Sequence, residues 1–515
     1  MLGVNYLGGA LTRAAMVVPR RKLNPAGGSC QPMRPSILIL AVLFSASIAS
    51  SQTPELVTVS DSGAADLAPR IADKYSWKYV AWIRASSGSN GNIMFSAAWP
   101  GEQGFRAPVS VTSSGMVNAT LQRGPELAIS SRNVLHLVWM EDLDIYHSRS
   151  TDAGQTWSTP KDISRDDHRA TQDFTSIAAD SAGNIYVIWT DNRDVVDDKS
   201  ENDHIYITRS TDDGTTWDTP HRADANPGGT GGSCECCRTA IAAAGDGHVY
   251  IAYRSNINNR RDIFAARSTN GGVSFDPSIV LQSKQLHLMA CPATGPLIAL
   301  DENENLHAVY RTGGFDDKFS VFYNVLRNGE MSANEETLIT PLGDVANYPS
   351  VALNGSGSPV VAYQRSGRVY FRYKDGAQWS QEKLLYSSGK SQRFVWLAQD
   401  FHKNVIAVWE DNVRDRGDVL LTNVPTATAT VRNEGATGSD EPNFVTRQGA
   451  VLRLEVEADR ALDWRVFDET GRELAPISSR HSGDVQELVV PELTPGLYYL
   501  QCTDRSLYYK ILVTR

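Results

Sequence analysis

The sequence predicts an all-β protein in which a large repetitive domain is followed by a small β-sandwich. Three observations lead to this fold class. No long stretch places apolar residues at the i, i+3, i+4, i+7 spacing of a helix. An eight-residue turn pattern occurs three times, and short apolar runs ending in an aromatic residue return at intervals of 46 to 64 residues. The 515-residue chain exceeds the roughly 250–300 residues of one ordinary core, and repetition accounts for that length.

The turn pattern occupies residues 150–157 and 210–217 and, in a degenerate form, residues 268–275. Each copy follows a short apolar run and holds an Asp or Asn that can accept backbone N–H groups, a Gly that can take φ > 0, and an aromatic residue that can pack as an anchor. The pattern therefore predicts a β-hairpin turn clamped by the acid. The residues that define it are Asp152, Gly154, Trp157, Asp212, Gly214, Trp217, Asn270, Gly272 and Phe275.

The aromatic-ended runs predict one four-stranded blade per repeat, and hence a β-propeller. Seven aromatics indicate seven blades, with six as the alternative, in a domain spanning residues 52–424. The seventh blade lacks a fourth strand, which residues 55–60 are expected to supply so that the ring closes. The aromatics are Trp82, Trp139, Trp189, Tyr253, Tyr310, Tyr363 and Trp409.

The turn pattern resembles the Asp box of sialidase-like (BNR-repeat) β-propellers. This resemblance implies the propeller fold and a structural role for the boxes, on the face away from the active site. Typical sialidases have six blades, so seven would be a departure from that family.

An apolar window at residues 37–44 follows Arg34 and precedes small residues that end at Ser51. It is too short to span a bilayer and is typical of the h-region of a signal peptide. We therefore assign residues 1–51 to an extension and signal peptide. The mature chain is expected to lack a transmembrane segment and to be secreted or held at the outer cell surface.

Residues 425–441 have the composition of a flexible linker, and residues 442–515 alternate as a small Ig-like β-sandwich. Within this tail, residues 466–472, 493–499 and 510–513 resemble the C-terminal sorting domain of the type IX secretion system. The resemblance implies secretion machinery as a partner. An ordinary C-terminal Ig-like module is the alternative.

The formal net charge is −10 and the charges are scattered, without a basic stripe or a Lys/Arg-rich run. Nucleic acid is therefore not an expected partner.

Antiparallel blades place the start of each inner strand and the loop after each second strand on one face, here called the mouth, and the Asp boxes on the other face. Arginines follow the aromatics at the mouth, a pattern that suits a carboxylate-bearing ligand. Acids in the same loops could instead pair with these arginines. The arginines are Arg84, Arg193, Arg254, Arg311 and Arg365, and the acids are Asp191, Asp194, Asp197, Glu410 and Asp411.

The resemblance to sialidases implies roles for individual residues. Arg70, Arg254 and Arg311 would hold the substrate carboxylate, and Tyr348 would be the nucleophile paired with Glu235. The loop at residues 84–92 holds no carboxylate where that family has its general acid. Asp73, Asp142 or an acid of the 194–203 loop are the possible substitutes. The two functions that result are exo-α-sialidase-type glycoside hydrolysis and non-catalytic binding of a carbohydrate or glycoprotein.

Four cysteines form a separate group, because Cys234, Cys236 and Cys237 precede the fourth inner strand and Cys291 precedes the fifth. In an exported protein we expect two disulfides that clamp blades 4 and 5. The alternative is a thiolate metal site with His287 nearby. Acids of the 194–203 loop could bind Ca²⁺, but a solvated loop is favoured, so no cofactor is expected.

Overall fold

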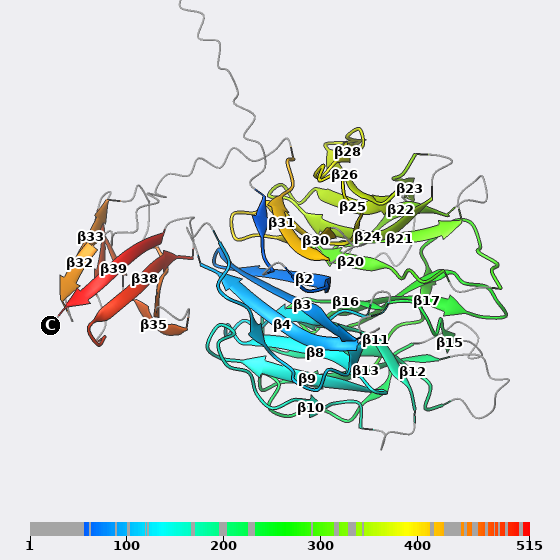
Figure 1. Ribbon diagram of the computed structural model, residues 1–515, viewed down its shortest axis with the longest axis horizontal. Helices are drawn as coiled ribbons and strands as arrows, with labels where there is room; N and C mark the ends of the chain where they lie inside the picture. The colour runs from blue at the N-terminus through cyan, green and yellow to red at the C-terminus, as the bar shows by residue number, and fades with distance from the viewer. Residues whose placement is uncertain are drawn as a thin grey trace, which may run out of the picture. The chain divides into compact units, whose positions relative to one another are not determined.

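The computed structural model describes residues 56–514 with internal gaps at 61–62, 88–89, 100–103, 119, 121–122, 166–169, 195–202, 225–231, 290–291, 314–318, 328–335, 342–344, 412–416, 427–443, 448–450, 456–461, 469–471, 478, 483–484, 490–492 and 504–507. The signal peptide, most of the linker, Cys291 and most acids of the 194–203 loop thus lie outside the described residues. The described part is built from strands and turns, which confirms the all-β class (Figure 1). It contains no helix that could cross a membrane.

The propeller is made of antiparallel units built on four strands, to which blades 4 and 6 each add one short strand. Blades 1 and 2 share a nine-stranded sheet, because the short strand β6 (Val117–Asn118) pairs with a strand of each. Blade 1 comprises β2 (Asp66–Lys74), β3 (Trp77–Ser87), β4 (Asn90–Ala98) and β5 (Val109–Ser110), and blade 2 comprises β7 (Glu126–Ile129), β8 (Leu135–Glu141), β9 (Asp144–Ser150) and β10 (Lys161–Asp162).

Blades 3 to 5 follow in chain order. Blade 3 comprises β11 (Gln172–Ala179), β12 (Ile185–Asp191), β13 (His204–Ser210) and β14 (His221–Arg222). Blade 4 comprises β15 (Gly232–Ser233), β16 (Ala240–Ala243), β17 (Val249–Asn256), β18 (Ile263–Ser268) and β19 (Ile279–Val280), and blade 5 comprises β20 (Leu297–Leu300), β21 (Leu306–Gly313), β22 (Phe319–Leu326) and β23 (Thr337–Leu338).

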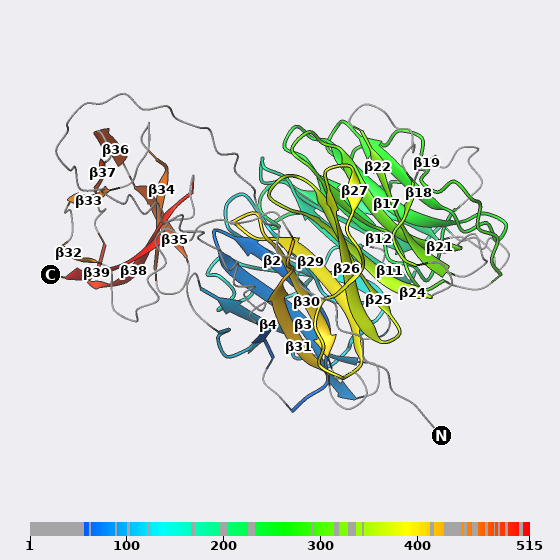
Figure 2. The ribbon, with the colours of Figure 1, turned by 90° about the horizontal axis from the view of Figure 1, so that it is seen from above.

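The last two units close the ring. Blade 6 comprises β24 (Ala346–Leu353), β25 (Pro359–Arg365), β26 (Arg368–Asp375), β27 (Gln378–Trp379) and β28 (Lys383–Leu384), and blade 7 comprises β29 (Gln392–Gln399), β30 (Val405–Asp411) and β31 (Asp418–Asn423). The N-terminal strand β1 (Val57–Thr58) is the fourth strand of blade 7, since Val57 pairs with Leu421 and Thr58 with Leu420 (Figures 1 and 2). The predicted closure by residues 55–60 is confirmed.

The seven aromatic markers occupy equivalent positions in the described residues. Each lies on the second strand of its unit and is buried between neighbouring sheets, where its apolar surface fills the space between blades. This regularity is what a seven-bladed ring requires, and the blade count itself stays a prediction. The markers are Trp82, Trp139, Trp189, Tyr253, Tyr310, Tyr363 and Trp409.

The Asp boxes form the predicted turns. In the first box, Oδ1 of Asp152 accepts the backbone N–H of Thr156 at 2.9 Å and the hydroxyl of Ser150 at 2.7 Å, and the N–H of Gly154 is bound by Ser150 Oγ at 2.8 Å. Gly154 has φ 88°. The boxes around Asp212 and Asn270 repeat these bonds.

Each box also packs on the preceding blade. The ring of Trp157 contacts that of Phe95 edge to face at 5.1 Å between centroids, and Trp217 contacts His147 in the same way at 4.9 Å. A Cβ at Gly154 would lie 1.9 Å from Phe95, and one at Gly214 would lie 2.5 Å from His147. The glycines are therefore needed for close approach between blades as well as for their backbone conformation.

The boxes lie on the same face as the turns between first and second strands, because the N–H of Gly271 donates to the carbonyl of Gly247 at 2.8 Å. The starts of the inner strands are at the other end. There the register shifts by a β-bulge in β2, β11, β24 and β29. The bulges hold Ala68, Phe174, Tyr348 and Phe394 at φ near +50°, which re-aims the side chains at the mouth.

The C-terminal strands form two sheets, as the predicted sandwich requires. One has the order β32-β39-β38-β34-β35 and the other β33-β37-β36. Trp464, Leu500 and Ile511 are buried in its core. The strands are β32 (Phe444–Arg447), β33 (Val451–Glu455), β34 (Trp464–Asp468), β35 (Glu473–Ile477), β36 (Ser479–Ser482), β37 (Val485–Val489), β38 (Gly496–Cys502) and β39 (Tyr508–Thr514).

Candidate functional site

A buried charge network lies at the centre of the mouth. The carboxylate of Glu126, which opens β7, accepts Nε of Arg70 at 2.9 Å through one oxygen and Nη2 of Arg238 at 2.6 Å through the other. Both guanidinium groups also lie over the ring of Trp396, at 4.4 Å and 4.3 Å from its centroid. Three inner strands and the residues just before a fourth therefore converge on one point.

This network holds more positive than negative charge, because two arginines share one carboxylate. Burial lowers the pKa of Arg238 to about 9, even though Glu126 raises it, and the charge of Arg70 lowers it further. Arg70 was predicted as a ligand-binding residue, and here its charge is partly neutralised inside the protein.

A cavity of about 20 Å³, room for one water molecule, adjoins the network. Arg70, Arg238, Tyr348, Phe394 and Trp396 line it. Two of the predicted site residues, Arg70 and Tyr348, are thus brought together. The ring of Tyr348 lies 4.4 Å from that of Phe394, and burial raises the pKa of its hydroxyl, against the charges of Arg393 and Arg311, which lower it.

Arg254 does not point into this cavity. Its guanidinium donates to backbone carbonyls of Thr294 at 3.0 Å, of Arg261 at 2.8 Å and of Arg311. Arg254 therefore ties blade 4 to blade 5 and has few N–H groups left for a ligand. The predicted role of Arg254 in carboxylate binding stays a prediction, and in this structure carbonyl oxygens surround the side chain.

Arg311 has more N–H groups available to a ligand than Arg254 has. Its Nη1 donates to the carbonyl of Pro292 at 2.7 Å and its guanidinium lies 4.1 Å from the centroid of Phe319, while its buried Nε has no hydrogen-bond partner. Burial and the charge of Arg254 lower the pKa of Arg311 to about 10, and Tyr348 raises it. Within the described residues no salt bridge joins Arg254 or Arg311 to a carboxylate.

Glu235 does not pair with Tyr348. Its carboxylate lies 3.3 Å from Nη1 of Arg261 and accepts Nδ2 of Asn256 at 3.3 Å, and the side chain is 45% exposed. Glu235 belongs to the turn that leads into blade 4, and this turn directs it toward the loop between β17 and β18. The predicted nucleophile pair is therefore not formed.

The acids proposed as substitutes for the missing general acid lie at different places in the propeller. Asp73 ends β2 at the Asp-box face and accepts the N–H of Phe401 at 2.9 Å, so it is too far along the strand to serve the mouth. Asp142 is exposed in the β8–β9 hairpin. Asp203 lies at the mouth end of blade 3, where burial, with Glu235 next in effect, raises its pKa to about 7.

Most other mouth arginines pair with acids, as the alternative reading predicted. Arg193 binds Asp191 at 2.6 Å, and Glu410 binds Arg393 at 2.6 Å. Arg84 and Arg365 use acids that the sequence did not single out, Asp66 at 2.9 Å and Glu382.

The cysteines depart from the predicted two disulfides. Cys234 and Cys237 are free thiols in the structure, with sulfur atoms 3.3 Å apart. Cys236 is disulfide-bonded, and Cys291 lies outside the described residues. The N–H of Cys237 donates to the carbonyl of Cys234 at 3.4 Å, and this local turn brings Cys234 next to Cys237 and not across to the next blade. The hydrogen bond from Cys234 and the charge of Arg254 lower the pKa of Cys237 against the effect of burial.

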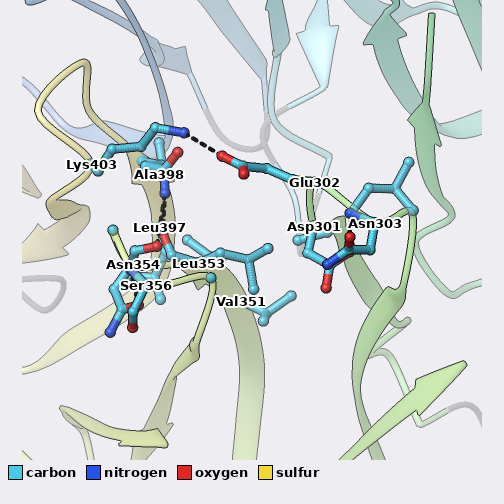
Figure 3. Close-up of a pocket in the computed structure, with 16 residues that line it drawn as sticks. Asp301, Glu302, Asn303, Val351, Leu353, Asn354, Ser356, Leu397, Ala398 and Lys403 are labelled. Atoms are coloured by element: carbon cyan, nitrogen blue, oxygen red, sulfur yellow. Dashed lines mark hydrogen bonds and ion pairs between the residues drawn. The ribbon is translucent and has the colours of Figure 1, made fainter. Parts of the chain in front are cut away.

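A larger cavity, of about 490 Å³, opens at the other end of the inner strands. Val351, Leu353 and Leu397 form its apolar wall, and Figure 3 shows the ion pair between Lys403 and Glu302, 3.1 Å long, at its rim. None of the predicted site residues lines this cavity. It belongs to the Asp-box face.

Three central residues, Glu126, Arg238 and Trp396, were not singled out from the sequence. Each lies at or near the start of an inner strand. Trp396 follows the bulge residue Phe394 by two positions, whereas β7 and β16 pair without a bulge. An alignment of the repeats on Arg70 and Tyr348 could have identified these residues, because Pro69, Pro125 and Pro349 precede the inner-strand residues of three blades at equivalent positions.

Comparison with known proteins gives one family match. The model of the BNR repeat-like domain matches residues 141–358, which supports the resemblance to Asp-box propellers. No curated protein matches the chain.

Several solved structures are similar at low identity. A protein of unknown function from Dyadobacter fermentans is 14% identical, with 72% of this chain and 97% of that chain covered and a TM-score of 0.43. The α-L-arabinanase of Penicillium chrysogenum, complexed with arabinobiose, is 13% identical (66% and 98%, TM-score 0.42). The Hadza microbial sialidase Hz136 is 15% identical (67% and 76%, TM-score 0.40). These likenesses concern the fold only.

Proposed function

We propose that the mouth of this propeller binds a carboxylate-bearing glycan. The observation that carries the proposal is the unbalanced positive charge there. Arg70 and Arg238 share the single carboxylate of Glu126, and Arg254 and Arg311 have no salt bridge to a described acid. Buried charges are costly unless they are paired, so an anionic ligand would be stabilised at this end of the channel. The rings of Tyr348 and Trp396 are partly exposed beside this network and offer an apolar surface on which a sugar can pack.

The test compares acidic with neutral glycans. Sialyllactose and glucuronate-containing oligosaccharides should bind by calorimetry, and lactose should not. Arg311→Ala should weaken binding at least about tenfold, because it removes a largely desolvated charge. Arg365→Ala is the matched control, since Arg365 is already neutralised by Glu382. Circular dichroism checks that both variants fold. Equal affinity for neutral and acidic glycans, or no binding of either, would refute the proposal.

Sialidase-type hydrolysis is the second candidate, and Asp203 is the observation that favours it. A carboxyl with a pKa of about 7 can donate a proton near neutral pH. The absence of a Glu235–Tyr348 contact weighs against a tyrosine nucleophile. A fluorogenic sialoside should be turned over by the wild type, less by Asp203→Asn and Tyr348→Phe, and progressively less as the pH rises through about 7. Turnover that both substitutions leave unchanged would remove this candidate.

We further propose export through the signal peptide, followed by delivery to the medium or the cell surface through residues 442–515. The composition of residues 33–51 and the resemblance of the tail support this proposal.

A further inference from the structure

Three side chains from two neighbouring blades meet on the Asp-box face, away from the mouth. Asp246 and His248 come from the turn between β16 and β17, and Glu304 comes from the turn between β20 and β21. Nδ1 of His248 lies 3.0 Å from Oδ2 of Asp246 and 2.7 Å from Oε2 of Glu304. The three donor atoms lie within 4.8 Å of one another.

The turns that supply these residues repeat around the propeller, so the repeat shows what is ordinary at each position. In four other blades the first residue of the turn is Asp180, Asp301, Asn354 or Asp400, and its side-chain oxygen binds the N–H of the fifth residue at 2.7–2.9 Å. In blade 4 the first residue is Ala244, which has no such group. Its turn is instead capped from the third position, where Oδ1 of Asp246 accepts the N–H of His248 at 3.1 Å.

The fifth position of the turn also departs from the repeat in blade 4. The fifth residue is Asn184, Asn305, Ser358 or Asn404 in other blades, and only blade 4 has a histidine among the described turns. The fourth residue takes a left-handed conformation. It is Gly183 in blade 3 and Gly357 in blade 6, but Glu304 at φ 58° in blade 5 and Lys403 at φ 64° in blade 7. The two residues of blade 4 that depart from the repeat, Asp246 and His248, therefore meet Glu304 of the next blade.

The local chemistry is that of an incomplete coordination sphere. One Nδ1–H cannot satisfy two carboxylates fully, and two carboxylates facing each other repel. Tyr250 donates its hydroxyl to Oε2 of Glu304 at 3.3 Å and so orients this carboxylate from behind. Such a hydrogen bond from a surrounding residue is typical of metal ligands. Oδ2 of Asp246 is left for an ion, because the capping bond uses Oδ1.

We propose that Asp246, His248 and Glu304 form a binding site for a divalent transition-metal ion of the Zn²⁺ type. An imidazole nitrogen with two carboxylate oxygens suits Zn²⁺, whereas Ca²⁺ and Mg²⁺ prefer oxygen ligands alone. Bonds of about 2.0–2.2 Å in a tetrahedral site place donor atoms about 3.3–3.5 Å apart. To reach this spacing, Oδ2 of Asp246 and Oε2 of Glu304 must each move away from Nδ1 of His248 by less than about 1 Å, from 3.0 Å and 2.7 Å. Asp246 is exposed and the other two side chains are partly exposed, which leaves room for this movement. Water would complete the coordination, and the ion would fasten blade 4 to blade 5.

The test measures Zn²⁺ stoichiometry by calorimetry on the full-length reduced protein, since the cysteines provide a second class of zinc ligand. His248→Gln, Asp246→Asn and Glu304→Gln should each lose one equivalent of Zn²⁺, or weaken it at least tenfold. Zn²⁺ should raise the melting temperature of the wild type more than that of these variants, and Ca²⁺ should have no such effect. His204→Gln is the matched control, because His204 contacts a single carboxylate, Asp224, at 3.0 Å.

Loss of one zinc equivalent in the three variants but not in the control supports the site. An unchanged stoichiometry and affinity in His248→Gln overturns it and leaves the triad as an ordinary ion pair. Equal loss in His204→Gln also overturns it, because any histidine–carboxylate pair would then suffice. The side chains are on the surface, so variants that fail to bind zinc are expected to keep the wild-type circular dichroism spectrum.

Discussion

At the scale of single residues, Glu126 sets the charge balance around the two central arginines of the mouth. It is the one described carboxylate that both central arginines contact, and it is buried with them. Trp396 and Phe394 line the small cavity beside it. The charge of Glu126 therefore offsets part of the buried positive charge, and the remainder is the basis of the proposed anion binding.

Replacing Glu126 with Gln should destabilise the protein by about 3–5 kcal/mol, because two buried guanidinium groups lose their counter-charge. Equilibrium unfolding in urea measures the change. Glu382→Gln is the control, since its partner Arg365 is partly exposed and the expected cost is below about 1 kcal/mol. Equal effects of the two substitutions would show that the central network adds no stability of its own.

The oxidation states of Cys234, Cys236 and Cys237 give a second prediction for single residues. Alkylation of the denatured, unreduced protein should label Cys234 and Cys237 and leave Cys236 unlabelled, because the first two are free thiols and the third is disulfide-bonded. Peptide mass spectrometry reads the labels. A peptide in which all three cysteines escape labelling would instead support the two disulfides predicted from the sequence.

At the scale of elements, the Asp boxes join blades as well as turn strands. Behind the second box lies a pair of buried histidines, in which Nδ1 of His136 and Nε2 of His147 are 3.1 Å apart. Arg149 donates to the carbonyl of Asp213 in that box at 2.8 Å. The joint between blades 2 and 3 thus depends on side chains that can take up protons.

This joint should weaken in acid. Burial lowers the pKa of His136 to about 4, although the charge of Asp213 raises it. Burial also lowers the pKa of His147 well below its usual value, and the charges of Arg149 and Lys161 lower it further. An unfolded histidine has a pKa of about 6.5. The unfolded chain therefore binds more protons below that pH, and the free energy of unfolding should fall between about pH 6.5 and pH 4.

Unfolding in urea across this range checks the prediction. His147→Gln should reduce the slope with pH, whereas His221→Gln, at a histidine that bonds only the carbonyl of Gly272, should not. The raised pKa values of Asp73 and Asp203 act in the opposite direction, since their stabilising effect is lost as the pH rises. Both variants keep Asp73 and Asp203, so the contribution of these aspartates cancels when the pH slopes of the two variants are compared. Parallel pH profiles for both would contradict the role of the histidine pair.

At the scale of the whole molecule, the ring is closed by pairing the first strand with the last. β1 pairs with β31 as the outermost strand of the last blade, so the N-terminal residues complete a sheet whose other strands come from residues 392–423. Figure 2 shows β31 and β30 of this blade. Residues 442–515 form sheets with a hydrophobic core of their own. A sorting role separate from the function of the propeller is therefore compatible with the structure of this segment.

Deleting residues 442–515 should leave a folded propeller that no longer reaches the medium or the cell surface. Fractionation of cells that express the full and the shortened chain measures this, with melting temperature as the control for folding. Normal delivery of the shortened chain would refute the sorting role.

The sequence by itself determined the repeat, the strand order within a blade, the Asp boxes and the closing strand. These features follow from turn chemistry and strand periodicity, which act over a few residues and recur in each blade. The tertiary structure decided which charges meet. Arg70 and Glu126 are 56 residues apart, and Glu235 turns toward Arg261 because the cysteine turn directs it there. Arg254 is enclosed by carbonyls of the next blade. Such pairings depend on how whole blades are placed around the channel, and no local pattern records that placement.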